Sequence, residues 1–270
     1  MFFLGFSAGL PLLLVLGTLG FWLREAGIDR STIGYLSWVA LFYAGKWLWA
    51  PLVDRVPILF FTKRLGRRRS WLLFAQALII FGLIGMATTD PKQNLEPIVW
   101  FALLVAFGSA TQDIALDAFR IESAKAQYQA ALAASYQTGY RLAMIWAGAG
   151  ALWLAARAET TTGIYLAEAW QFAYLCMALS ISVGVVTTLL SPEPQAVLLP
   201  KARSAGQWLQ QTLIEPFADF ISRYRWQAFL ILGLIAIYRI SDVVMGIMAN
   251  PFYVDMGYTK DEVAAVTKVF

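Results

Sequence analysis

Long apolar runs separated by short polar stretches repeat along nearly the whole chain. A transmembrane helix needs about 20 mostly apolar residues, and seven runs reach that length. They cover residues 2–23, 32–53, 70–89, 97–120, 130–156, 169–190 and 226–250, and an eighth begins near Asp261. The first run lacks the positively charged start of a signal peptide and exceeds its usual apolar length. The pattern predicts an all-α polytopic membrane protein.

Composition narrows the chemistry. The chain is 59% hydrophobic and 14% charged, with a mean hydropathy of +0.61. It has no histidine and one cysteine, Cys176. The chain therefore lacks the residues needed for the usual zinc sites, for Ser/His/Asp and Cys/His triads and for disulfide frameworks. We expect no enzyme of these classes, no metal and no cofactor.

Lys and Arg are distributed unevenly among the connections. The stretches 54–69, 120–129 and 191–225 hold twelve of them, whereas the connections on the other side hold five. Cytoplasmic loops of membrane proteins are enriched in these residues, so the start of the chain is expected to face the cytoplasm. The spans that flank the arginine run at 67–69 argue against a nucleic-acid partner.

The connection after the sixth run is long, polar and rich in proline. Six helices, a long cytoplasmic linker and a further helix are the layout of a two-bundle transporter. We expect a six-helix bundle at 1–190, a cytoplasmic linker at 191–225 and the start of a second bundle at 226–270. Room remains for only one complete span and part of another, so we interpret the chain as a piece of a longer protein that lacks its C-terminal bundle.

Several apolar runs contain charges, which cost about 2.5 to 3.5 kcal/mol each at the bilayer centre by insertion scales. Runs one, three and six contain none. The charged residues in the interior of the others are Lys46, Asp113, Asp117, Arg141, Arg239 and Asp242. This distribution is typical of a bundle in which some helices face lipid and others face a wet cavity.

Asp113 and Asp117 are four residues apart and therefore share one helix face, with Gln112 beside them. Two carboxylates in a low-dielectric site repel each other and lose hydration, which favours the protonated form of at least one. That behaviour suits a proton carrier. The alternative is a purely structural role, in which these carboxylates form ion pairs with Arg141 or Lys46, or Asp117 pairs with Arg120.

Three other charged positions allow more than one interpretation. Arg141 lies on a helix rich in small residues and can bind either a substrate anion or Asp113. Lys46 lies among aromatic residues that either stack on sugar rings or form an interfacial belt, and the belt is favoured. Arg239 and Asp242, three residues apart, favour a local ion pair.

The string Ala50-Pro51-Leu52-Val53-Asp54-Arg55, followed by Gly66-Arg67-Arg68-Arg69, resembles the loop between helices two and three of the major facilitator superfamily. In that superfamily the aspartate and the arginines lock the cytoplasmic side. The resemblance implies a cytoplasmic gate at Asp54, Arg55, Arg67, Arg68 and Arg69. The stretch Val56 to Leu65 between the two halves departs from the pattern.

A closer resemblance, in order along nearly the whole chain, is to the AmpG muropeptide permeases, a branch of that superfamily. The matching strings are Gly5-Phe6-Ser7-Ala8-Gly9-Leu10-Pro11, Thr32-Ile33-Gly34, Lys46-Trp47-Leu48-Trp49-Ala50-Pro51, Gly66-Arg67-Arg68-Arg69-Ser70-Trp71, Ser109-Ala110-Thr111-Gln112-Asp113-Ile114-Ala115-Leu116-Asp117-Ala118, Gly139-Tyr140-Arg141-Leu142, Ser191-Pro192-Glu193-Pro194 and Tyr238-Arg239-Ile240-Ser241-Asp242.

The resemblance implies two six-helix bundles, of which this chain holds the first, the linker and the start of the second. It further implies a multi-pass protein of the bacterial inner membrane that imports N-acetylglucosaminyl-1,6-anhydro-N-acetylmuramyl peptides for peptidoglycan recycling. Alternating access driven by the proton gradient is the expected mechanism. We expect proton coupling at Asp113 and Asp117. Substrate contacts are expected at Lys46, Gln112, Arg141, Arg239 and Asp242.

Three rival functions stay open. The acetyl-coenzyme A transporter branch is similar around Gln112 and Asp113, so an anionic metabolite is an alternative substrate. An intramembrane aspartyl protease would use Asp113 or Asp117 with Asp242, but the Ile-Ser-Asp-Val setting of Asp242 departs from the Gly-x-Gly-Asp of such enzymes. A sensor or assembly protein without transport activity is the third.

Overall fold

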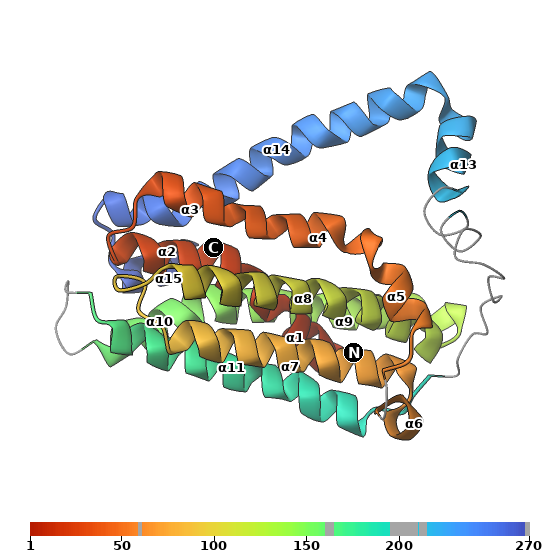
Figure 1. Cartoon of the computed structure of the whole chain (residues 1–270), viewed down its shortest axis with the longest axis horizontal. Helices are drawn as coiled ribbons and strands as arrows, with labels where there is room; N and C mark the ends of the chain where they lie inside the picture. The colour runs from red at the N-terminus through yellow and green to blue at the C-terminus, as the bar shows by residue number, and fades with distance from the viewer. Residues whose placement is uncertain (59–60, 160–164, 195–209, 211–214, 268–270) are drawn as a thin grey trace. The chain divides into compact units, whose positions relative to one another are not determined.

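The computed structural model describes residues 1–58, 61–159, 165–194, 210 and 215–267 (Figure 1). Every regular element in these ranges is helical, which confirms the all-α class. The chain divides into two compact units. One comprises Met1–Gln195 with Ile247–Phe270, and the other comprises Ala196–Gly246.

Four helices of the described residues are long and apolar enough to cross a membrane, as predicted. The first, Phe2–Glu25, consists of α1 (Phe2–Leu13), the π-helical η1 (Leu14–Thr18) and α2 (Leu19–Glu25). The other three are α7 (Arg67–Ala87), α8 (Glu96–Ser123) and α11 (Ala167–Leu190). The chain is therefore a multi-pass membrane protein.

The second predicted span is helical but irregular, with a turn at Trp49. It consists of α3 (Arg30–Leu36), the 3₁₀ turn η2 (Ser37–Ala40), α4 (Leu41–Gly45), the 3₁₀ turn η3 (Lys46–Leu48) and α5 (Ala50–Arg55). Pro51 lies in the first turn of α5, where its missing N–H costs no helical hydrogen bond, so the helix restarts there. At the other end Asp29 caps α3 by accepting hydrogen bonds from Ser31 and Thr32, which lower the pKa of its carboxyl below the usual range.

The fifth predicted span consists of the short η4 (Ala126–Tyr128), α9 (Gln129–Ile145), the π-helical η5 (Trp146–Gly150) and α10 (Ala151–Ala158). It packs closely against the first span. A Cβ added at Gly139 would lie 2.1 Å from the Phe2 carbonyl oxygen, so only glycine fits this crossing. Further along, the Thr18 hydroxyl donates to the Ala147 carbonyl at 2.8 Å and joins the two π segments.

Aromatic side chains fill the bundle near the ends of α2 and α11. Trp22 and Trp170 stack with ring centroids 5.7 Å apart, and both are almost fully buried. The buried Tyr174 hydroxyl donates to the Leu14 carbonyl at 2.9 Å. Elsewhere large apolar side chains lie on the surface, including Phe81 at 62% and Leu179 at 72% exposure. An apolar surface of this kind suits lipid rather than water.

The remaining helices are α6 (Phe61–Leu65), α13 (Glu215–Tyr224), α14 (Trp226–Asp255) and α15 (Lys260–Thr267). The end of α14, from Ile247, and α15 belong to the first unit. The boundaries predicted for the six-helix bundle and the linker stay predictions.

Candidate functional site

An ion pair joins the second and fourth spans. Lys46 in η3 lies with its Nζ 3.3 Å from Oδ2 of Asp113 in α8. The Lys46 side chain is 38% exposed and that of Asp113 18%. The pair therefore lies at the edge of the helix packing rather than in its interior.

Asp117 has a different partner. Its Oδ1 lies 3.4 Å from Nη2 of Arg120, and its side chain is 56% exposed. Asp113 and Asp117 lie on the less buried face of α8. The opposite face carries Gln112, Ala115 and Leu116, which are buried. The shared face expected from the spacing is thus present, and each carboxylate has its own cation.

Gln112 and Arg141 lie apart from this ion pair. Gln112 is fully buried, donates from Nε2 to the Ser7 hydroxyl at 3.3 Å, and its Oε1 has no partner among the described residues. Arg141 is exposed on α9, with Nη1 3.9 Å from the sulfur of Met144. Arg141 was expected to bind either a substrate anion or Asp113. In this structure Asp113 pairs with Lys46 instead.

Aromatic side chains surround the Lys46 end of the pair. Trp49 packs against Phe107 of α8 with ring centroids 5.3 Å apart, and Phe42 lies 6.2 Å from Trp49. The Trp49 Nε1 donates to the Thr111 hydroxyl at 3.1 Å. Trp49 thus fixes η3 against α8 beside Asp113, whereas Trp47 is 48% exposed.

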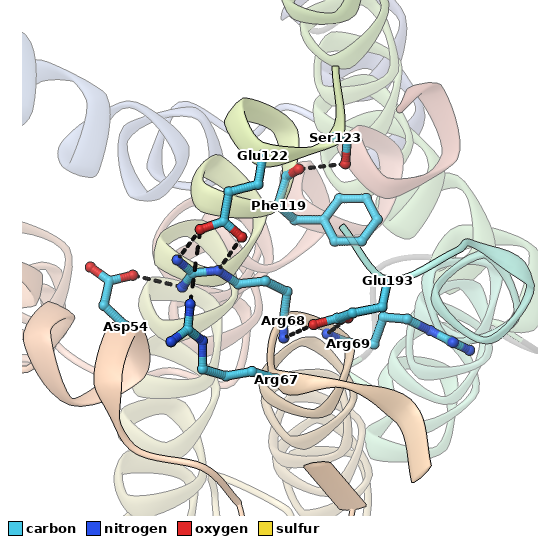
Figure 2. A network of polar contacts seen from close by, with 8 residues as sticks. All are labelled: Asp54, Arg67, Arg68, Arg69, Phe119, Glu122, Ser123 and Glu193. Atoms are coloured by element: carbon cyan, nitrogen blue, oxygen red, sulfur yellow. Dashed lines mark hydrogen bonds and ion pairs between the residues drawn. The ribbon is translucent and has the colours of Figure 1, made fainter. Parts of the chain in front are cut away.

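A second cluster of charges surrounds Arg68 at the start of α7 (Figure 2). We call Asp54, Arg67, Arg68 and Glu122 the Arg68 cluster. The Arg68 guanidinium donates to both oxygens of Glu122 at 3.0 and 2.6 Å and to Asp54 at 2.6 Å. Its side chain is only 5% exposed, so these charge-assisted hydrogen bonds stabilise a nearly buried cation. Arg67 lies 4.0 Å from Glu122.

Glu193 connects the end of α11 to the same helix start (Figure 2). Its carboxylate accepts from the backbone N–H groups of Arg68 at 2.8 Å and Arg69 at 3.1 Å. These are two of the N–H groups that a helix leaves unpaired at its beginning, where a negative charge is also favourable. Arg69 donates back to the carbonyls of Thr188 and Leu189 in α11. Four of the five residues predicted for the cytoplasmic gate therefore meet in one network.

Sequence reasoning missed Glu122 as a partner and gave Glu193 no role. Glu122 could have been found by asking which carboxylate near the same membrane face would neutralise the arginine run. Three further predicted residues are not tested by contacts. The side chains of Arg55, Arg239 and Asp242 lie outside the described residues.

Gly66→Ala is expected to weaken the junction between α7 and Glu193. Gly66 has φ of +88°, and a Cβ there would lie 2.2 Å from Cδ of Glu193. The substitution therefore strains the backbone and displaces the cap, with a loss of about 1–3 kcal/mol in unfolding free energy. Thermal unfolding in detergent measures it. Gly27→Ala is the matched control, because its φ of +89° is similar but nothing lies within 4 Å. An equal loss in both variants would show that the Glu193 contact adds nothing.

The helices define a multi-pass membrane protein, and ion pairs between its helices are typical of transporters. Residues 1–146, more than half of the chain, match the family model described as acetyl-coenzyme A transporter 1. The chain therefore belongs to this transporter family.

Curated relatives extend the similarity over the whole chain and confirm the resemblance to AmpG permeases. A putative transporter AmpG 4 of Rickettsia conorii (strain ATCC VR-613 / Malish 7) is 35% identical over 270 residues, which cover 100% of this chain and 62% of the relative. The anhydromuropeptide permease of Escherichia coli (strain K12) is 38% identical over 267 residues, 98% of this chain and 50% of the relative. The chain thus spans 50% to 62% of the length of these relatives, whose names are those of transporters rather than enzymes.

Proposed function

We propose that the protein containing this chain imports anhydromuropeptides across the bacterial inner membrane by proton-coupled alternating access. The relative in Escherichia coli supports this substrate class, since it is named an anhydromuropeptide permease and matches 98% of the chain. The proposal places the N-terminus in the cytoplasm, on the basis of the Lys and Arg distribution. In this proposal the protein serves peptidoglycan recycling. The proton gradient drives the import, and no cofactor is required.

The observation that carries the mechanism is the ion pair between Lys46 and Asp113. The two groups come from different spans and lie 3.3 Å apart at the edge of the packing. Protonation of Asp113 would remove its charge and release Lys46, whose ammonium could then bind an anionic group of the substrate. Binding of the proton and of the substrate would thereby favour each other, which is the requirement for symport.

The other predicted residues take supporting roles in this proposal. Asp117 lies one helical turn from Asp113 and would pass protons toward it. The exposed guanidinium of Arg141 would bind a substrate carboxylate. Gln112 is buried, so it would act on the substrate indirectly, through its hydrogen bond to Ser7. The Arg68 cluster would gate the cytoplasmic side, together with Arg55, and Arg239 and Asp242 would contribute from the seventh span.

An Asp113→Asn, Asp117→Asn double variant is expected to lose pH-dependent uptake, because neither side chain can then exchange a proton. Uptake of radiolabelled anhydromuropeptide into proteoliposomes, with the protein expressed from its full reading frame, measures this. Glu96→Gln is the matched control, since this carboxylate lies in the first turn of the same helix and accepts a hydrogen bond from Trp100. Uptake by the double variant that keeps the pH dependence of the wild type would refute the coupling role.

The family model itself favours one alternative, since it is described as acetyl-coenzyme A transporter 1. An anionic metabolite of that kind would also suit Lys46 and Arg141. Competition distinguishes the two substrates. Unlabelled disaccharide peptide should suppress muropeptide uptake, whereas suppression by acetyl-coenzyme A alone would favour the alternative.

A further inference from the structure

A third group of charges lies at the helix ends far from the Arg68 cluster. The second span runs from Arg30 to Arg55, so Arg30 and Asp54 mark its opposite ends. At the Arg30 end, Asp255 accepts hydrogen bonds from both Arg24 and Arg30, the first at 2.5 Å. Desolvation alone would raise the pKa of the Asp255 carboxyl, but these two hydrogen bonds outweigh it and lower the pKa.

Lys260 is the most buried charge of this group. Its side chain is 4% exposed, and its ammonium pairs with Glu25 at 2.9 Å and with Glu159. It also lies 4.9 Å above the ring of Trp170, whose Nε1 donates to Glu25 at 2.6 Å. A cation above an aromatic face gains further stabilisation where water is excluded. We call Arg24, Glu25, Arg30, Glu159, Asp255 and Lys260 the Lys260 cluster.

The Lys260 cluster joins segments that are far apart in the sequence. Glu25 ends α2, and Glu159 follows α10. Asp255 and Lys260 come from the segment Ile247–Thr267, which holds the end of α14 and α15. Apolar contacts also hold this segment against the first spans. Val263 of α15 is buried in the hydrophobic core, and Tyr253 packs against the same core. The charges therefore fasten this segment to the helix ends of the first spans.

The charges of the cluster cancel. Three cations face three carboxylates, so no net charge is left to attract an ionic substrate. A buried ion pair is stable only when complete, because removing one partner leaves an uncompensated charge. Partial separation of the nearly buried Lys260 and Glu159 is thus unfavourable, and the cluster favours two states, one paired and the other apart and hydrated. This behaviour suits a latch rather than a binding site.

We propose that the Lys260 cluster is a latch that holds the segment Ile247–Thr267 against the first spans and closes the end of the transporter opposite to the Arg68 cluster. The latch dissociates whenever that end opens. This inference rests on the proposed transport by alternating access, but not on the identity of the substrate.

Labelling of a reporter cysteine tests the latch without any substrate. In the full-reading-frame protein, Cys176 and any cysteine outside this chain are replaced by serine, and Thr138→Cys places a reporter on the exposed face of α9, one turn before Arg141. A membrane-impermeant maleimide is added from the side on which Lys260 lies. Lys260→Gln is expected to increase the labelling rate roughly tenfold or more, because it leaves Glu25 and Glu159 without their cation. Lys260→Arg should restore slow labelling, since it keeps the charge.

Matched variants make the result decisive. Lys92→Gln removes a cation at the same end of the helices. The Lys92 ammonium lies above the Tyr165 ring rather than against the segment Ile247–Thr267, so the labelling rate should not change. Asp255→Asn serves as a second test of the latch if Lys260→Gln does not fold. Wild-type labelling rates in the folded latch variants would overturn the proposal. Faster labelling without muropeptide uptake would support the latch and refute only the proposed substrate.

Discussion

Replacing Arg68 by alanine is expected to cost about 3–5 kcal/mol of stability. The side chain is 5% exposed and makes charge-assisted hydrogen bonds to Glu122 and Asp54. Its removal would leave the Glu122 side chain, which is 9% exposed, without its main cation. The unfolding midpoint in detergent and the transport rate in proteoliposomes should both fall.

Two companion variants show whether the geometry of Arg68 matters as well as its charge. Arg68→Lys keeps the charge but cannot bind both oxygens of Glu122, so it should recover only part of the stability. Arg64→Ala removes an exposed arginine four residues earlier in the chain and should leave the unfolding midpoint within error of the wild type. If Arg64→Ala and Arg68→Ala lost equal stability, the Arg68 cluster would have no special role.

Gly139→Ala is expected to separate the first and fifth spans. The added methyl group would lie 2.1 Å from the Phe2 carbonyl oxygen and 3.0 Å from the Phe6 nitrogen. Because both are backbone atoms, no side-chain rotation relieves the contact and the helices must move apart. Overpacking of this kind costs about 1–3 kcal/mol, and the loss of close packing adds to it. Thermal unfolding of the purified protein measures the effect.

Gly233→Ala is the matched control for the helix position. Gly233 lies inside α14, and nothing lies within 4 Å of the Cβ that alanine would add. Alanine is the better helix former by about 0.5–1 kcal/mol, so this variant should be neutral or slightly more stable. Destabilisation of both variants to the same extent would show that glycine serves helix flexibility and not the contact between α1 and α9.

The candidate site could be predicted in part. The intramembrane charges stand out because ionised groups in apolar runs are costly, and Lys46 and Asp113 are two of the six residues selected in this way. The shared face of Asp113 and Asp117 follows from helical spacing. Their partners did not follow, because Lys46, Arg120 and Arg141 were all available to them. The burial of Gln112 was also hidden, since a glutamine next to an exposed face faces the core or the cavity according to how α1 packs.

What the sequence determined by itself is the fold class and the positions of the four helices that are long and apolar enough to span a membrane. Each of these is a local property of a stretch of about 20 residues, because the bilayer acts on every stretch separately. The tertiary structure decided the pairings. Lys46 and Asp113 are 67 residues apart, Arg68 and Glu122 are 54 apart, and Lys260 and Glu159 are 101 apart. Such partners meet only when helices pack, and which oppositely charged ends come together depends on the glycine contacts and aromatic stacking that set the packing.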